Sequence, residues 1–332
     1  MKKLLALLLT VVMICSLAAS TAVAHADSGK TVVLKFAHAV AETLPQHQAF
    51  VEFAEAVKER TGGAVQIDVY ANSQLGGERD IMEGLQLGTI DFGCVSTAVV
   101  ANFVPEYYLF DTPFLFSDTE STLKVCDSEI GQGMADKLHS SQGIRQVGFL
   151  DIGGRNVFST KPVETIDDFK GLKIRVMEND LHIALFNAIG AQATPMAFSE
   201  LYTALQQGTV DAGENSLMGI KGSGFDDICK YISITNHVYG INVLLLGDLA
   251  YQKIPEEYRD IVMEEAWNCV LNERVLVGEA NQKAISQMEE NGCTVYTLDH
   301  EALVEKVTPI YDKFADQLPT ELIAQAQAML AE

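Results

Sequence analysis

Recognisable catalytic motifs are absent from this 332-residue sequence. It contains no G-x-S-x-G, H-E-x-x-H or G-x-G-x-x-G motif, no phosphate-binding loop and no EF-hand calcium loop. Its seven histidines are scattered, and none has the spacing of a zinc site. These absences lower the expectation of catalysis without excluding it, and they predict that no cofactor and no metal is bound.

Positive charge is also scarce. The sequence has 23 Lys and Arg against 45 Asp and Glu, a formal net charge of −22 at pH 7. A chain this acidic binds nucleic acid and anionic membranes poorly, so we expect no nucleic-acid partner. If the ligand is an anion, individual arginines must overcome the unfavourable field of the whole chain.

Long apolar runs are confined to the N-terminus. Two lysines precede an apolar run from Leu4 to about Leu17, and Ala24-His25-Ala26 then matches the A-x-A pattern of signal peptidase sites. The run is too short for a permanent transmembrane helix. We predict a signal peptide over residues 1–26, a mature chain starting at Asp27, and a location in the periplasm or extracytoplasmic space. Cys15 is not preceded by the small residues of a lipoprotein signal.

Cysteines are few after this segment. The remaining five are odd in number, widely spaced and without a C-x-x-C motif: Cys94, Cys126, Cys229, Cys269 and Cys293. This pattern indicates neither a disulfide framework nor a metal site. Buried thiols are the favoured interpretation, and one disulfide stays open.

Strand and helix patterns alternate from Thr31 onward. Leu34, Phe36 and His38 share one face of an expected strand, and an amphipathic helix pattern follows until Thr61. A second strand, a helix over 78–87 and a third strand over 90–95 complete a β-α-β-α-β order. That order predicts a parallel sheet covered by helices.

An internal repeat is the most informative feature. Leu85-Gln86-Leu87-Gly88-Thr89-Ile90-Asp91-Phe92-Gly93 recurs as Leu205-Gln206-Gln207-Gly208-Thr209-Val210-Asp211-Ala212-Gly213. Each copy predicts a helix end, a C′ glycine and a strand. Because ligands of open α/β sheets lie beyond the carboxyl ends of strands, Ser96-Thr97 and Glu214-Asn215 are candidate site segments. The alternative is that both copies are only efficient helix-to-strand turns.

The second half of the sequence predicts another α/β unit. Leu172, Ile174 and Val176 alternate along a strand, and helices are expected over 180–189 and 198–207. A helical stretch begins at Pro255 and continues to Gly292, with only Gly278 inside it. At 1.5 Å per residue it is roughly 50 Å long, so we expect it to lie across both units. A helix broken near Gly278 is the competing interpretation.

Two arginines are candidates for binding an anion. Arg175 alternates with the apolar residues of its strand, and Arg155 follows Gly153-Gly154, where a ligand can approach the backbone. Two guanidinium groups converging on a cleft suit a carboxylate, because each presents a planar fork of donors. The alternatives are a solvated strand arginine and a loop arginine.

Motifs distributed over most of the chain carry a family resemblance. They are Asn72-Ser73-Gln74-Leu75-Gly76, Gly88-Thr89-Ile90-Asp91, Pro105-Glu106, Pro113-Phe114, Lys170-Gly171-Leu172-Lys173-Ile174-Arg175-Val176, Pro195-Met196-Ala197-Phe198-Ser199-Glu200, Val210-Asp211 and Glu214-Asn215. The chain resembles the solute-binding component of tripartite ATP-independent periplasmic (TRAP) transporters, of the C4-dicarboxylate and sialic-acid-binding (DctP) type. Two segments depart from the residue pattern of this family: Ala212-Gly213 and Ser216, in the expected loop around Asn215.

The resemblance implies a set of ligand-binding residues. Arg175 matches the arginine that forms a two-pronged salt bridge with the ligand carboxylate, Arg155 a second cationic position, and Asn215 an amide that contacts the same carboxylate. The other implied site residues are a lining aromatic, two positions that vary with the ligand and a residue at the end of the first strand: Phe198, Glu78, Ser96 and His38.

We therefore predict an α/β, two-lobed fold of the periplasmic-binding-protein type, with a hinge and a long lobe-bridging helix. Lobe I would comprise 27–152 plus 241–280, and lobe II 153–240 plus 281–332. The predicted function is capture of a small organic carboxylate, a C4-dicarboxylate or sugar acid, by a monomer that delivers it to membrane-embedded TRAP subunits. An exported enzyme acting on a carboxylated substrate and a ligand-sensing receptor subunit stay open as alternatives.

Overall fold

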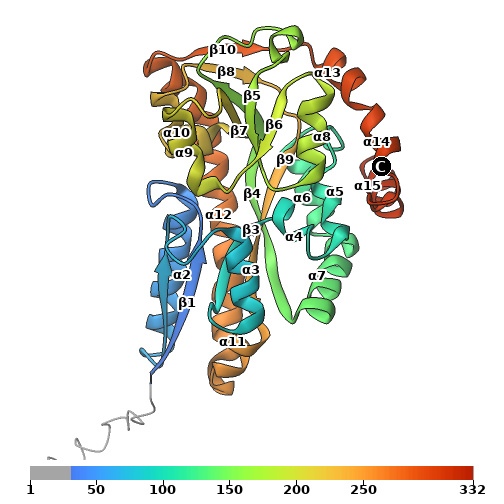
Figure 1. The fold of residues 1–332 in the computed structure, drawn as a ribbon. Coiled ribbons are helices and arrows are strands. Elements are labelled where there is room, and N and C mark those ends of the chain that lie inside the picture. The colour runs from blue at the N-terminus through green and yellow to red at the C-terminus, as the bar shows by residue number, and fades with distance from the viewer. Residues whose placement is uncertain (1–30, 332) are drawn as a thin grey trace, which may run out of the picture. The chain divides into compact units, whose positions relative to one another are not determined.

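The computed structural model describes residues 31–331, and Figure 1 shows the arrangement of their elements. The predicted signal peptide, its cleavage site after Ala26 and Cys15 lie outside the described residues. None of the described helices is long and apolar enough to cross a bilayer.

Ten strands of the described residues form one continuous sheet. They are β1 (Val32–His38), β2 (Val65–Tyr70), β3 (Phe92–Ser96), β4 (Ile144–Ser159), β5 (Lys173–Val176), β6 (Gln192–Pro195), β7 (Ala212–Ser216), β8 (Tyr231–Ile234), β9 (Tyr239–Gly247) and β10 (Thr294–Thr297).

The longer helices are α2 (Pro45–Arg60), α3 (Glu78–Leu87), α6 (Thr119–Cys126), α7 (Glu129–Gln142), α8 (Asp180–Ala188), α9 (Phe198–Gln206), α12 (Glu256–Glu290), α13 (His300–Val307) and α15 (Thr320–Leu330). The shorter ones are α4 (Thr97–Val100), α5 (Tyr108–Asp111), α10 (Leu217–Gly222), α11 (Asp248–Lys253) and α14 (Pro309–Lys313).

The central strand order is β2-β1-β3-β9-β4-β7-β5-β6. β1 runs parallel to β2 and β3, as the β-α-β-α-β pattern predicts. β9 lies between β3 and β4 and is antiparallel to both, which the expectation of a parallel sheet did not include. β4 pairs with β9 along its first part and with β7 and β8 along its last residues. It therefore connects an N-terminal sheet region (β2, β1, β3, β9) to a C-terminal one (β7, β5, β6, β8, β10).

The two repeat copies form the same turn. Gly88 and Gly208 have φ of 70° and 68°, in the left-handed region that glycine adopts without strain. The two residues after each glycine still donate backbone hydrogen bonds to the preceding helix, to Gly84 and Ala204. For this reason the third strand begins at Phe92 instead of at residue 90.

Helix α12 continues through Gly278 without a break, so the interpretation of a broken helix is wrong. Its 35 residues span about 52 Å, and it packs against α2, β4, α10 and β10. A glycine costs a helix interior only about 1 kcal/mol. Burial of Val277, Ala284 and Met288 on either side of this point favours the continuous helix. In Figure 1 the helix runs alongside both sheet regions.

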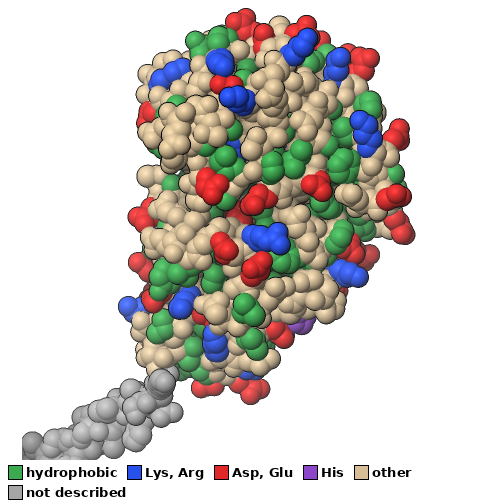
Figure 2. Space-filling view, viewed as in Figure 1, with side chains coloured by type: hydrophobic (Ala, Val, Ile, Leu, Met, Phe, Trp, Pro, Cys, Tyr) green, Lys and Arg blue, Asp and Glu red, His purple; other side chains and the backbone are tan. Residues whose placement is uncertain are grey.

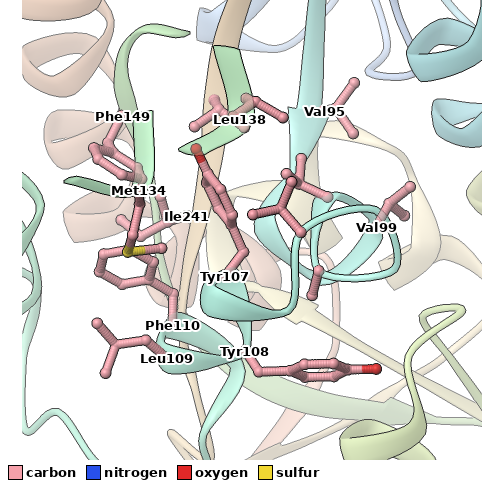
Figure 3. Packing of buried hydrophobic residues seen from close by; sticks show 14 of the residues in the cluster. Val95, Val99, Tyr107, Tyr108, Leu109, Phe110, Met134, Leu138, Phe149 and Ile241 are labelled. Atoms are coloured by element: carbon pink, nitrogen blue, oxygen red, sulfur yellow. The ribbon is translucent and has the colours of Figure 1, made fainter. Parts of the chain in front are cut away.

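A large apolar cluster stabilises the N-terminal sheet region around α4, α5 and α7. Figure 3 shows Tyr107 and Phe110 projecting from the short turn before and within α5 toward the residues around Met134 and Phe149. The Phe110 and Phe149 rings lie 5.1 Å apart, within the range of favourable aromatic contacts.

The last helix packs where the sequence did not predict. Residues 281–332 were expected in lobe II, yet α15 contacts α6 and α7, and Leu318 and Ala326 belong to the apolar cluster of the N-terminal sheet region. Ala326 of this helix is buried there and Leu322 and Ile323 pack against the same cluster, whereas α13 contacts α8. The lobe boundaries as a whole stay a prediction.

The five cysteines of the described residues are all buried and all free. Burial raises the pKa of the Cys94, Cys126 and Cys269 thiols. They pack as small apolar side chains, which is the favoured interpretation of their spacing.

Candidate functional site

A cavity lies at the ends of β3 and β7, the strands that the two repeat copies lead into. Its lining includes six of the seven sequence-predicted site residues: Glu78, Ser96, Arg155, Arg175, Phe198 and Asn215. Both sheet regions contribute to it, and its empty volume is about 740 Å³, counting space open to solvent. Ser96 ends β3 and Asn215 lies in β7, so the two repeat copies lead into the same cavity.

Arg175 is buried on β5, with 3% of its surface exposed, which excludes the interpretation of a solvated strand charge. Its only hydrogen bond with a described residue runs from Nε to the Met196 carbonyl oxygen, at 2.8 Å. Burial lowers its pKa to about 10, with Glu214 and Glu78 opposing the shift, so the group stays charged at neutral pH. Its guanidinium carbon lies 5.8 Å from the centre of the Phe198 ring. The Nη edge is therefore free to receive an anion.

Arg155, by contrast, is already paired. Its Nε and Nη2 donate to the two carboxylate oxygens of Glu214 at 2.6 and 2.9 Å, and Nη2 also donates to the Glu214 carbonyl. Only Nη1 faces another side chain, the Asn215 Oδ1 at 3.3 Å. Both charged side chains are buried, so they interact in a region of low dielectric. Two short, parallel hydrogen bonds strengthen this ion pair.

One buried histidine extends this network, and a second one lies beside it. His237 Nε2 lies 3.2 Å from Glu214 Oε2, and His182 Nε2 lies 3.0 Å from Asp111 Oδ1. Burial opposes ionisation of Glu214, but Arg155 and the His237 hydrogen bond lower its pKa below the ordinary value. The ligand atoms of His182, Glu214 and His237 lie within 4.8 Å of one another. Arg155 engages both oxygens of Glu214, and His182 pairs with Asp111, so these three residues do not fit a metal ion.

Glu78, the first residue of α3, faces the cavity from the N-terminal sheet region. Its Oε2 accepts a hydrogen bond from Ser96 Oγ at 2.5 Å, and its Oε1 accepts one from the Ser96 backbone N–H at 3.3 Å. Burial raises the pKa of Glu78, and the Ser96 hydrogen bonds together with Arg175 and Arg155 oppose the shift. The site thus holds a carboxyl group as well as cations.

His38 is not among the cavity-lining residues, although Ala39 and Val40 are. Its side chain is fully buried on the apolar face of β1, beside Phe36 and Phe50, with Nε2 3.1 Å from His47 Nδ1. In the sequence, His38 alternates with the apolar Leu34 and Phe36 along the strand. This pattern indicates that its side chain lies on the core-facing side of β1 and not in the cavity.

Sequence reasoning missed several polar lining residues: Gln46, Ser73, Glu178, Ser216 and Asn242. Asn242 is the one polar side chain in the apolar run of β9, and that exception could have identified it. The Ser73 hydroxyl has no hydrogen-bond partner among the described residues. It lies in a loop with φ of 56°, for which no sequence pattern gave a warning.

Segments of the two sheet regions also meet around the cavity. Thr43 Oγ1 donates to the Gly222 carbonyl at 2.6 Å, and Leu44 packs with Met218 and Val277. The side-chain amide of Asn179 donates to the Ala98 carbonyl at 3.0 Å. These contacts join the two sheet regions next to the cavity.

The buried His38 predicts a pH dependence of stability. Burial, together with neighbouring His47, lowers its pKa to about 3 from an ordinary value of 6.5. The unfolded chain therefore takes up a proton first, so this stabilisation is complete above about pH 6.5 and is lost as the pH falls toward 3. The slope from this group reaches about 1.4 kcal/mol per pH unit. Urea denaturation measures the free energy of unfolding at pH 7 and at pH 4.5. Between these two pH values the free energy of unfolding should fall less for His38→Gln than for the wild type, and equal decreases would contradict the prediction.

Comparison with known proteins identifies the family. Residues 36–317 match the family described as bacterial extracellular solute-binding protein, family 7 (DctP). The C4-dicarboxylate-binding periplasmic protein DctP of Rhodobacter capsulatus is 32% identical over 306 residues, which cover 91% of this chain and 92% of that protein.

Solved structures are also similar. A TRAP periplasmic solute-binding protein from Polaromonas sp. JS666, bound to D-erythronate, superposes with a TM-score of 0.85 at 35% identity, covering 90% of this chain and 98% of that one. The sugar acid binding protein of Advenella mimigardefordensis, in complex with galactonate, gives a TM-score of 0.88 at 29% identity, with coverage of 91% and 98%. The chain therefore belongs to bacterial extracellular solute-binding protein family 7, the two-lobed solute-binding proteins of TRAP transporters.

Proposed function

We propose that this protein captures a small organic carboxylate outside the cytoplasm and delivers it to the membrane subunits of a TRAP transporter. The observation that carries the proposal is the uncommitted guanidinium edge of Arg175 inside a cavity lined by both sheet regions. A planar fork of donors binds a carboxylate with two parallel hydrogen bonds. The erythronate, galactonate and C4-dicarboxylate in the names of related proteins support a carboxylate as the ligand class.

The remaining lining residues receive roles consistent with this chemistry. Asn215 supplies an amide next to Arg155, Phe198 a ring beside Arg175, and Ser96 and Glu78 a hydrogen-bonded pair on the other side. Arg155 contributes positive potential and positions Asn215, since its own donors are mostly used by Glu214. His38 supports the end of β1 behind Ala39.

Capture requires two lobes that move about a hinge. We assign the hinge to β4 and β9, the two strands that pass between the sheet regions, where the pairing is irregular between Asp151 and Gly153. Rotation there would expose the cavity to ligand, and the contacts of Thr43 and Asn179 would re-form on closure. The lobe boundaries stated from the sequence at 152/153 and 240/241 fall at this hinge.

Binding without turnover distinguishes the proposal from an exported enzyme. Family members are binding proteins. The cavity contains one hydroxyl–carboxyl pair, Ser96 and Glu78, and among the described residues no third side chain hydrogen-bonds Glu78 to orient it as a base.

Native mass spectrometry of the protein as purified tests the function. We expect a retained mass of a small organic acid, and we expect the same compound to be recovered unchanged after denaturation and incubation with fresh protein. Chemical conversion of that compound would favour the enzyme, and failure of every carboxylate to bind stripped protein would contradict the proposal.

A further inference from the structure

We infer that the cavity selects a polyhydroxylated monocarboxylate over a dicarboxylate, and that Glu78 is the residue that excludes a second carboxylate. This inference rests on the proposed function and narrows its ligand class. It follows from the count and the pairing of the charged groups that line the cavity, which are Glu78, Arg155, Arg175 and Glu178.

The cavity offers one uncommitted cation. Arg155 donates hydrogen bonds from Nε and Nη2 to the carboxylate of Glu214, so the charge of this guanidinium is already balanced within the protein. Arg175 has no ion-pair partner among the described residues and donates only to a carbonyl oxygen. A single ligand carboxylate therefore satisfies the cationic capacity of the site, and a second one would find no free guanidinium.

Glu78 decides what the rest of the ligand must be. Each of its oxygens accepts one hydrogen bond from Ser96 and has a further lone pair available. An ionised carboxylate only accepts hydrogen bonds, so it pairs with ligand hydroxyl groups and repels a ligand carboxylate. Glu178, exposed at the cavity, adds negative charge and no donor.

The other lining groups reinforce this preference. Ser73, Asn215 and Asn242 offer neutral hydroxyl and amide groups that match ligand hydroxyls, and the Ser73 hydroxyl is unpartnered. Apolar side chains such as Val99 and Met177 complete the lining and leave little water to solvate a second charge. The site is thus matched to a monoanion that carries several hydroxyl donors.

Calorimetric titration with matched pairs of acids tests the inference. D-Gluconate and D-glucarate, and likewise D-erythronate and meso-tartrate, differ only in a terminal hydroxymethyl group that becomes a carboxylate. In the pair that binds the wild type better, we expect the monocarboxylate to bind at least tenfold more tightly than its dicarboxylate partner. Glu78→Gln keeps the shape and removes the charge, so it should weaken the monocarboxylate, strengthen the dicarboxylate and reduce their ratio roughly tenfold or more.

Glu83→Gln is the matched control, because it removes the same charge from an exposed position of the same helix, α3, outside the cavity. Its ratio should stay close to that of the wild type. A dicarboxylate that binds wild type as tightly as its monocarboxylate partner would overturn the inference and leave the proposed function standing. An unchanged ratio in Glu78→Gln would remove Glu78 as the selecting residue. Absence of binding by all four acids and by succinate would overturn the proposed function as well.

Discussion

Replacement of Arg175 by alanine should weaken carboxylate binding by roughly two to three orders of magnitude or more. Arg175 is 3% exposed, and its guanidinium donates only through Nε to the Met196 carbonyl oxygen and has no partner for its Nη edge among the described residues. Inside a cavity sheltered from water, loss of one member of a desolvated ion pair costs roughly 3–5 kcal/mol, and each 1.4 kcal/mol corresponds to about a factor of ten. Calorimetric titration with a bound carboxylate measures the effect.

Two further variants sharpen this prediction. Arg175→Lys keeps the charge but replaces a planar fork with a compact ammonium group, so it should recover only part of the lost affinity. Lys173→Ala removes a cation from the same strand at an exposed position outside the cavity, and it should bind almost as well as the wild type. Near wild-type affinity for a folded Arg175→Ala would contradict the central role given to this residue.

Replacement of Glu214 by glutamine should lower the free energy of unfolding by roughly 3–5 kcal/mol. Glu214 is fully buried, and its carboxylate accepts two hydrogen bonds from Arg155. His237 Nε2 lies 3.2 Å from its Oε2. Its neutral isostere leaves the Arg155 charge buried without a counter-ion. Urea denaturation at neutral pH, monitored by circular dichroism, gives the change directly.

Controls separate the buried pair from ion pairs in general. Glu83→Gln breaks the exposed pair with Arg79 and should cost less than about 1 kcal/mol. The double variant Glu214→Gln, Arg155→Met removes both charges and should be more stable than Glu214→Gln alone, because no unpaired charge remains. A loss for Glu214→Gln as small as that for Glu83→Gln would show that the buried pair is replaceable.

The same pair adds to the pH dependence. Because Arg155 and His237 lower the pKa of Glu214 below its ordinary 4.5, the stabilisation is present above that value and is lost as the pH falls through the lower, folded-state pKa. It acts in the same direction as the loss expected from His38. Burial raises the pKa of Asp151 to about 6 and also raises that of Glu273, so these two carboxyl groups act in the opposite direction. The interspersed charges of the surface in Figure 2 are hydrated and contribute less.

Elements with strong local patterns could be predicted from the sequence. The α3 boundaries, the start of α9 at Phe198 and the turn glycines of both repeat copies agree with the structure, because periodicity and the positive φ of glycine act within a few residues. The pairing of β9 between β3 and β4 could not be predicted, since a short apolar run does not specify its partners or its direction.

The sequence by itself determined the alternation of strands and helices, the repeat, the family motifs and the presence of arginines that suit a carboxylate. Only the tertiary structure decided that Arg155 is neutralised by Glu214 while Arg175 stays free, that His38 faces the core, and that α15 packs against α6 and α7. The physical reason is that the partners of a charge or an apolar face lie far apart along the chain. Arg155 and Glu214 are 59 residues apart, and no local rule of propensity or spacing determines that they meet.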